Sequence, residues 1–570
     1  MKTKNKKAEL FFLIAILSIS IISCTPTEDK VKKPNIMLIV VDDMGYSDLG
    51  CYGGEIKTLN LDRLAESGVQ MTNFYALPMC APTRACLLTG VDNHQNGMGN
   101  MPPLHTSNQY MQTGYEGYLN KNVITLPEIL SDNGYHTYMA GKWHLGVHST
   151  DNYPIGRGFK KSFAQMGGGS GYFQDGFDLG PFETPITFYT RNDKRIDELP
   201  EDFYSTKAFT DEMIQYITRQ EDNKPFFGYL AFTAPHDPLH VPDNYMDKYK
   251  GIYDNGYDTI RTARLNRMKE MGLIDKSVPN NPGTGNFPTW KSLSKDEKKL
   301  QARKMELYSA MIDYVDVQVG RLIDVLKQKG EYDNTLFIFM SDNGANPKEP
   351  LFYYLGNKEL FDSMGFDNSL ENMGRTNSFV SQGGSWAEVS ATPYTYYKTT
   401  TGEGGIRTPL IVSGKGIETN GIKNATMHVT DIFPTILDYV GIERPDTYKG
   451  NTLNPLYGQS AKSFLTNNSE SVRNTMNEPL CFELNGYKAV IKGDWKLMSG
   501  DEFSTGTEWK LVNLADDPGE KIDLAGQNPE KFTELKEDWQ EYSKKYGYIK
   551  PEGELHVICI GAETFYKFEQ

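Results

Sequence analysis

The chain has 570 residues, which is long enough for a large buried core and more than one domain. Hydrophobic residues make up 38% and charged residues 23%, as in ordinary soluble globular proteins, and the formal net charge is −15. Such an acidic surface argues against nucleic acid as a partner, and any site for an anion has to be a local cationic pocket.

The first residues have the composition of an export signal. Four lysines lie between residues 2 and 7, and an apolar run follows from Leu10 to Ile22. This run is shorter than the about 20 residues that a membrane span needs. We therefore predict a signal peptide over residues 1–23.

The segment Ile21-Ile22-Ser23-Cys24 resembles the bacterial lipobox, in which the cysteine becomes the acylated first residue of a lipoprotein. We predict a lipidated Cys24 and a polar tether over residues 24–33. The protein would then be an exported lipoprotein of the periplasm, outer membrane or cell surface of a bacterium, and only its lipid anchor would meet the membrane. An ordinary signal peptide with an incidental cysteine is the alternative.

The mature chain is more acidic than the full one. Without residues 1–23, which contain four lysines and one glutamate, it carries 55 basic and 73 acidic residues, a net charge of −18. The five cysteines after Cys24 cannot all pair with one another, so one odd thiol needs another explanation.

Continuous apolar runs predict the strands of a mostly parallel sheet. Asn35–Val41 and Thr335–Met340 are typical of strands buried on both faces, and Pro225–Thr233 and Pro409–Val412 are further candidates. Lys304–Lys329 has apolar residues spaced for one face of a helix. Strands that alternate with helices predict an α/β sandwich, in which ligands gather beyond the carboxyl ends of the strands.

The pattern of predicted strands and helices changes beyond residue 460. Tyr487–Met498 and Glu508–Leu514 contain short strand patterns separated by turns, and Pro529–Tyr546 has a helical pattern. We predict a catalytic domain over 34–460 and a smaller α+β domain with an antiparallel sheet over 461–570. Two long stretches, Gly251–Leu300 and Ala345–Tyr397, match neither period and are expected to be loops that are functional or disordered.

The segment from Cys80 to Gly90 carries the most specific chemistry. Pro82 suits the first turn of a helix, which would put Cys80 at the amino end, where free N–H groups and the helix dipole favour an anion. Arg84 adds a planar cationic fork that suits an oxyanion. The alternative is a buried helix with a structural cysteine.

Cys-x-Pro-x-Arg followed by Leu-Thr-Gly resembles the signature of the formylglycine-dependent type I sulfatases. The resemblance implies an alkaline-phosphatase-like sandwich, with a large mixed, mostly parallel sheet between helices, and a maturation enzyme that oxidises Cys80 to formylglycine. Most members have Ser or Ala where this chain has Thr83, which bears on recognition by that enzyme.

Acidic residues at two strand ends resemble the metal site of the same family. The ligand set implied for this chain is Asp42, Asp43, Cys80, Asp342 and Asn343. Hard oxygen ligands suit Ca²⁺ or Mg²⁺, and their number favours Ca²⁺. The absence of a histidine cluster nearby in the sequence argues against zinc.

Three further blocks resemble the catalytic groups of the family. Gly141–Gly146 supplies Lys142 and His144, which would face the same side if the strand continued through both. Ala234–Pro238 supplies His236. A glutamate-glycine-glycine block follows Lys398 by five residues.

The resemblance also implies a role for each group. Arg84, Lys142 and Lys398 offset the charge of sulfate, His236 or Lys398 protonates the leaving alcohol, and His144 takes a proton from the second hydroxyl of the formylglycine hydrate. His240 is a weaker candidate, for contact with substrate.

Together these residues predict an arylsulfatase-like hydrolase of sulfate esters. The substrate is a sulfated small molecule or glycan, and Gly167–Phe173 and Leu351–Tyr397 are candidate substrate walls or else mobile surface loops. Two alternatives stay open: a phosphoester or phosphonate hydrolase of the same superfamily, and an unmatured lipoprotein that binds sulfoglycans. The sequence carries no sign of the oligomeric state.

Overall fold

The computed structural model describes residues 32–101, 104–174, 179, 187–354, 356–500, 508–552, 555–559 and 562–565. The chain divides into two units, 1–33 and 34–570, and the elements named below belong to the second. The predicted signal peptide, Cys24 and nearly all of the tether lie outside the described residues. Within those ranges no helix is both long and apolar enough to cross a bilayer.

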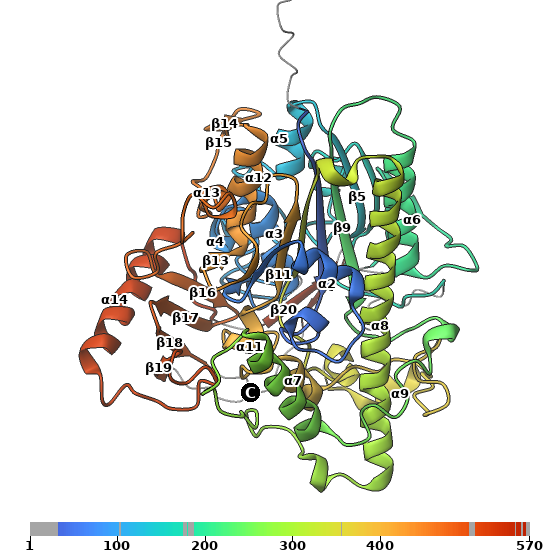
Figure 1. The fold of residues 1–570 in the computed structure, drawn as a ribbon, viewed down its shortest axis with the longest axis vertical. Helices are drawn as coiled ribbons and strands as arrows, with labels where there is room; N and C mark the ends of the chain where they lie inside the picture. The colour runs from blue at the N-terminus through green and yellow to red at the C-terminus, as the bar shows by residue number, and fades with distance from the viewer. Residues whose placement is uncertain are drawn as a thin grey trace, which may run out of the picture. The chain divides into compact units, whose positions relative to one another are not determined.

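A ten-stranded mixed sheet forms the centre of the large domain (Figure 1). Its strands, in spatial order, are β12 (Gly421–Lys423), β2 (Gly68–Met71), β11 (Leu410–Gly414), β10 (Thr335–Ser341), β1 (Asn35–Asp42), β9 (Phe226–Pro235), β5 (His136–Lys142), β6 (Lys161–Gln165), β7 (Tyr189–Arg191) and β8 (Lys194–Ile196). The middle of the sheet, from β10 to β6, is parallel, and β11 and β7 pair antiparallel at its two sides. The predicted strands are thus present, and β1 and β10 are buried along their whole length.

Helices cover both faces of this sheet. One face packs on α2 (Leu59–Glu66), α6 (Ser205–Thr218) and α8 (Lys295–Gln328), and the other on α3 (Cys80–Thr89), α5 (Leu126–Asp132) and α12 (Ile432–Val440). Alternate residues of β1 point into these two cores, with Met37 and Ile39 on one side and Ile36 and Leu38 on the other. The predicted alkaline-phosphatase-like sandwich is confirmed.

Shorter elements complete the domain. They are α4 (Asn93–Asn96), α7 (Tyr257–Met271), α9 (Lys358–Ser363), α10 (Gly384–Ser390), α11 (Glu403–Ile406) and α13 (Lys462–Leu465), with the strand pairs β3 (Phe74–Tyr75) and β13 (Met427–His428), and β14 (Thr447–Tyr448) and β15 (Asn451–Thr452).

The helices around residue 300 differ from the sequence prediction. Helix α8 begins nine residues before Lys304, because Ser294 caps it and exchanges hydrogen bonds with Glu297 in a capping box. Helix α7 lies in a stretch where no regular structure was expected. The helical spacing of apolar residues was not evident in the sequence, because the charged Arg264 faces the core and pairs there with Asp48 and Glu55.

The smaller C-terminal domain is an antiparallel sheet covered by one helix. The strands are β16 (Leu480–Leu484), β17 (Tyr487–Lys492), β18 (Trp495–Ser499) and β19 (Trp509–Asn513), and the helix is α14 (Pro529–Tyr546). One face of the sheet packs on α14 through Val490 and Leu497, and the other joins the core of the large domain through Phe482 and Ile491. Further along the chain, β20 (Leu555–Cys559) pairs with β21 (Ala562–Phe565) and with β4 (Leu104–Thr106) of the large domain.

A buried histidine also ties the two domains together. His94 in α4 lies 3.0 Å from Asp92 and 2.8 Å from Glu483 of β16, and the Tyr542 hydroxyl of α14 donates to Asp92. Burial lowers the pKa of His94, but the hydrogen bonds to Asp92 and Glu483 raise it more, to about 9.

This pKa predicts a pH-dependent stability. Because the pKa of His94 is higher in the folded chain than its usual 6.5, its contribution is complete below pH 6.5 and is lost as the pH rises through about 9. The loss amounts to about 3 kcal/mol. Urea denaturation of the wild type and His94→Gln at a series of pH values should show the gap between them narrowing over this range. A gap independent of pH would contradict the assignment.

Candidate active site

Two acidic strand ends meet at the carboxyl edge of the sheet. Strands β1 and β10 are neighbours, with Val41 opposite Ser341. The residues that follow are therefore adjacent: the Asn343 amide donates to Asp43 Oδ1 at 2.7 Å, and the Asp43 N–H donates to Asp342 Oδ1 at 3.3 Å. The acidic side chains at the two strand ends are thus neighbours, as the sequence predicted.

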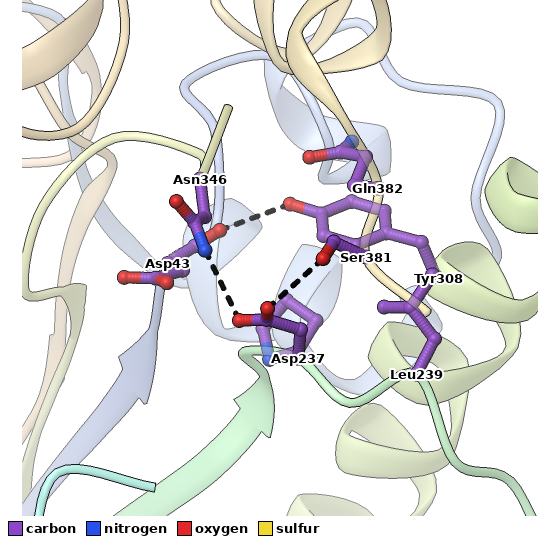
Figure 2. Close-up of a pocket in the computed structure, with 8 residues that line it drawn as sticks. Asp43, Asp237, Leu239, Tyr308, Asn346, Ser381 and Gln382 are labelled. Carbon is purple, nitrogen blue, oxygen red and sulfur yellow. Dashed lines mark hydrogen bonds between the residues drawn. The ribbon is translucent and has the colours of Figure 1, made fainter. Parts of the chain in front are cut away.

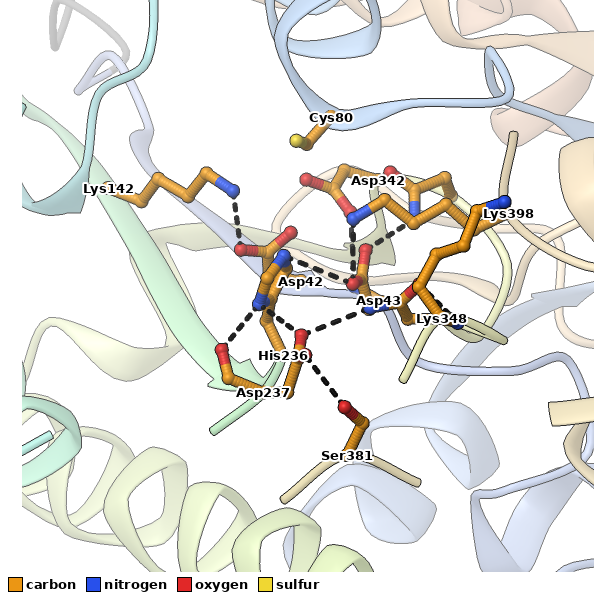
Figure 3. Close-up of polar contacts among 12 residues, drawn as sticks. Asp42, Asp43, Cys80, Lys142, His236, Asp237, Asp342, Lys348, Ser381 and Lys398 are labelled. Atoms are coloured by element: carbon orange, nitrogen blue, oxygen red, sulfur yellow. Dashed lines mark hydrogen bonds and ion pairs between the residues drawn. The ribbon is translucent and has the colours of Figure 1, made fainter. Parts of the chain in front are cut away.

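Helix α3 brings Cys80 to these acids (Figure 3). Cys80 is its first residue, as the position of Pro82 indicated. One ligand atom each of Asp42, Cys80 and Asp342 lies within 4.8 Å of the others. Thr83, the departure from the family signature, donates to and accepts from the backbone of Leu77, and so fastens the turn before the helix.

Each carboxylate is paired with a buried cation. Lys142 at the end of β5 donates to Asp42 Oδ2 at 2.6 Å, and Lys398 donates to Asp43 Oδ2 at 2.8 Å. Arg84 Nε donates to Asp342 Oδ2 at 2.9 Å, and Nη2 lies 2.7 Å from the same oxygen. Three carboxylates therefore face three cations, and the cluster is close to neutral.

The chemistry of the unmodified cysteine is unfavourable here. Cys80 is 1% exposed, and burial raises the pKa of its thiol in spite of the cations around it. A protonated thiol is a poor nucleophile, so an unmodified Cys80 is not activated by this environment.

His144 reaches Cys80 by a different route from the one predicted. Strand β5 ends at Lys142, and His144 has a left-handed backbone with φ of 55°, so the two residues are not on one continuous strand. The prediction of a shared strand face is wrong, yet the Nδ1 atom of His144 lies 3.5 Å from Cys80 Sγ. Burial and then Lys142 lower the pKa of His144 well below its usual value, which leaves a neutral ring that can accept a proton.

His236 lies on the other side of the acids. Its Nε2 atom is 3.4 Å from Asp43 Oδ2, and its Nδ1 atom is 2.9 Å from Asp237 Oδ1. Burial lowers the pKa of His236, whereas Asp43 and Asp237 raise it, and the net direction is upward. Asp237 is 3% exposed and sits next to His236 in the same block, but the sequence analysis did not single it out.

Strained backbone surrounds the reactive groups. Among the non-glycine residues with left-handed φ are Asp43 and His144 themselves, and Tyr396 and Thr399 on either side of Lys398. Such conformations persist only where the surroundings hold them, and they cluster at functional sites.

One of the predicted substrate walls, the glycine-rich loop, lies against the two histidines of the site. A Cβ atom on Gly168 would lie 2.9 Å from His144 Cε1, and one on Gly169 would lie 3.4 Å from His236 Cε1, so this glycine loop lies against both imidazoles. His240 is fully buried; Tyr172 N–H donates to it, and it contacts the Ser378 carbonyl. His240 thus links the segments that carry Tyr172 and Ser378, and its contact with a substrate stays a prediction.

The site has oxygens suited to a hard cation. Within the described ranges, Asp42 Oδ1 and Asn343 Oδ1 are buried and accept no hydrogen bond. A buried acceptor without a donor is costly, and a metal ion would satisfy both atoms. The residues present therefore fit a divalent cation that prefers oxygen ligands, such as Ca²⁺ or Mg²⁺.

The sheet, the acidic strand ends and the cysteine-bearing helix together define a hydrolase of the alkaline-phosphatase-like class. The chain belongs to the sulfatase family, whose profile matches residues 34–442, and is a sulfuric ester hydrolase. The profile of the N-sulphoglucosamine sulphohydrolase C-terminal region matches residues 394–545. Because these matches overlap, the boundary predicted after residue 460 stays a prediction.

Relatives of known sequence and structure agree with this assignment. An uncharacterized sulfatase of Schizosaccharomyces pombe is 39% identical over 555 residues, 93% of this chain and 97% of its own length. An arylsulfatase of Klebsiella aerogenes is 43% identical over 431 residues, 75% of this chain and 91% of its own. The crystal structure of Ps i-CgsB matches with a TM-score of 0.62 at 25% identity, and covers 92% of this chain and 95% of that one.

Proposed function

We propose that this chain is an arylsulfatase-like enzyme that uses a formylglycine made from Cys80 and a bound divalent cation. The observation that carries the proposal is the convergence of Cys80 with Asp42 and Asp342 in a buried site that three cations also reach. Asp42, Asp43, Asp342 and Asn343 would hold the cation, together with the side chain at position 80. We infer Ca²⁺ before Mg²⁺, because the oxygen ligands are many.

Charge explains why such a site takes an anion. The three carboxylates and three cations of the cluster nearly cancel, so a bound divalent ion would add an excess of positive charge in a buried place. In a low-dielectric surrounding this excess stabilises the sulfate group and the negative charge that develops on it. The acidic surface of the protein does not oppose this locally, since exposed charges are screened over about 8 to 10 Å in physiological salt.

The side chains divide the remaining tasks by position. A formylglycine hydrate supplies two hydroxyls on one carbon, one to attack sulfur and one to lose a proton. The Nδ1 atom of His144 lies 3.5 Å from Cys80 Sγ, so His144 is placed to accept that proton from the modified side chain. Lys142 and Arg84, which pair with Asp42 and Asp342, would balance the sulfate charge, and His236 or Lys398 would protonate the leaving oxygen.

The substrate class follows from the relatives by analogy. The Klebsiella relative is named an arylsulfatase, and Ps i-CgsB has been crystallised with k-i-k-neocarrahexaose. We infer aryl sulfates as working substrates and a sulfated glycan as a candidate natural one. A formylglycine-generating enzyme is the partner that maturation requires, and export as a lipoprotein would give the enzyme access to such glycans.

A phosphoester hydrolase with a second metal is the nearest rival. One further group, made of Asp43, His236 and Asp237, has the spacing of a metal site. Asp43 is, however, already a proposed ligand of the first cation, and both oxygens of Asp237 accept hydrogen bonds from neutral side chains. This group is therefore a weaker candidate for a metal site than Asp42, Cys80 and Asp342.

Mass spectrometry and turnover together test the proposal. In protein co-expressed with a maturation enzyme, the peptide around residue 80 should lose the thiol and carry an aldehyde. The same preparation should hydrolyse 4-nitrophenyl sulfate faster than 4-nitrophenyl phosphate. Full sulfatase activity with an intact Cys80 thiol would refute the mechanism, and a preference for the phosphate would favour the rival. Tight binding of sulfoglycans without turnover after maturation would point to a binding protein.

A further inference from the structure

A long segment that matched no sequence pattern reaches beneath the catalytic centre. Residues 345–397 contribute Asn346, Tyr353 and Ser381, and all three side chains donate to the carboxylate of Asp237. Asn346 and Tyr353 donate to Oδ1, at 3.0 and 2.9 Å, and Ser381 donates to Oδ2 at 3.0 Å. Figure 2 shows Asn346 and Ser381 on either side of Asp237.

These donors fix the carboxylate in one orientation. Ser381 is fully buried and Asn346 is 5% exposed, so their hydrogen bonds are shielded from water. The cavity beside them is only about 10 Å³ and is lined by Asp43, Asp237 and Gln382 among others. The Asp237 carboxylate therefore has little room to rotate, and it contacts the imidazole of His236.

The carboxylate in turn fixes the imidazole. His236 Nδ1 lies 2.9 Å from Asp237 Oδ1 and 2.6 Å from its backbone carbonyl, so this nitrogen faces two acceptors and carries the proton. The other nitrogen, Nε2, then points to Asp43 and the metal-ligand cluster. An anionic partner behind an imidazole both sets its tautomer and stabilises its protonated form.

We propose that Asp237 is a positioning residue that makes His236 the acid for the leaving group, and that residues 345–397 support it. The inference rests on the proposed function. As the ester S–O bond breaks, its electron pair goes to the alcohol oxygen, and the proton on His236 Nε2 moves to that oxygen. The proton on Nδ1 stays with Asp237, and water restores the one that was transferred. Lys398 remains with Asp43.

The aromatic part of the segment extends this support outward. The Tyr353 ring lies 6.4 Å from the His236 ring and stacks on Phe379, and Phe352 next to it is 44% exposed. Tyr353 thus connects the outer surface of the segment with the carboxylate beneath the imidazole. In this way a loop first viewed as a substrate wall also orients a catalytic group.

Leaving-group dependence tests this role in the matured full-length enzyme. Protonation matters most for a basic leaving group, so Asp237→Asn should lower kcat/KM for phenyl sulfate by about 100-fold and for 4-nitrophenyl sulfate far less. Ser381→Ala and Tyr353→Phe each remove one hydrogen bond to the same carboxylate and should give the same trend with smaller losses. If Asp237→Asn does not fold, the leaving-group dependence can still be measured with these two variants.

The matched control is Asp313→Asn, which alters a carboxylate that is equally buried but bonds Lys248 and Tyr249. It should leave the leaving-group dependence unchanged. In a double-mutant cycle, Asp237→Asn added to His236→Ala should cause no further loss, because both act through one ring. Equal losses for both esters, or additive losses in the cycle, would overturn the inference. A matured wild type that hydrolyses neither ester would instead contradict the proposed function.

Discussion

Replacing Cys80 with serine should remove turnover of sulfate esters, by about 10⁵-fold or more, and leave the fold unchanged. The exchange is nearly isosteric, and Cys80 lies in a buried site whose other contacts do not depend on sulfur. A serine has one hydroxyl on its β-carbon, so His144 would have no second proton to take and sulfate could not be expelled. Hydrolysis of 4-nitrophenyl sulfate by the variant and the wild type, prepared with the same maturation enzyme, measures the loss.

Cys86 offers a matched control for this experiment. It lies in the same helix and is equally buried, and its sulfur accepts a hydrogen bond from Asn96. Cys86→Ser should change stability and leave turnover close to that of the wild type. Mass spectrometry of the Cys80→Ser protein must also find an unmodified serine. Substantial turnover by that serine form would mean that the geminal pair of hydroxyls is not required.

The parts of the site that could be predicted are those that local sequence determines. Asp42 ends a strand that is buried on both faces, so its place at the carboxyl edge follows from the parallel sheet. Pro82 located the start of the helix that carries the cysteine. In each case the elements on both sides of the residue have a clear period.

The parts that could not be predicted depend on contacts between distant segments. Arg264 belongs to a buried ion pair that breaks the apolar stripe of its helix, so its partners are known only from the fold. His144 reaches the site because its own backbone is left-handed, and a strand pattern in the sequence does not reveal such a conformation. The donors to Asp237 come from more than a hundred residues away, within a segment that lacks any period.

The smaller domain also contributes to the position of Lys398. The segment that contains this lysine is fastened at both sides, since Thr395 donates to the Gly519 carbonyl and Thr401 donates to the Lys488 carbonyl. Both acceptors belong to the C-terminal domain. The C-terminal domain therefore helps to hold Lys398, one of the proposed catalytic cations, in place.

A buried ion cluster of Lys496, Glu403 and Glu520 lies where the C-terminal domain contacts the segment after Lys398. Lys496 of β18 lies 2.9 Å from Glu403 at the start of α11 and 2.7 Å from Glu520, and all three residues are at most 1% exposed. Burial raises the pKa of Glu403, but Lys496 and Arg407 lower it below its usual value. Burial and Glu403 raise the pKa of Glu520. Lys496, together with Arg407 beside Glu403, thus offsets the charge of two carboxylates that would otherwise repel each other.

Lys496→Met should therefore destabilise the protein by about 3–5 kcal/mol, because it leaves the buried Glu520 without a cation and Glu403 with Arg407 alone. Turnover should fall as well, since the segment with Lys398 loses its anchor. The control is Lys492→Met on the neighbouring strand, where partly exposed ion pairs to Glu534 and Asp538 contribute only about 0–1 kcal/mol. Urea denaturation followed by tryptophan fluorescence compares the variants. Adding Glu520→Gln to Lys496→Met should recover part of the stability, because it removes the buried charge that has lost its cation. If both lysine variants were equally stable, the junction would not depend on this ion group.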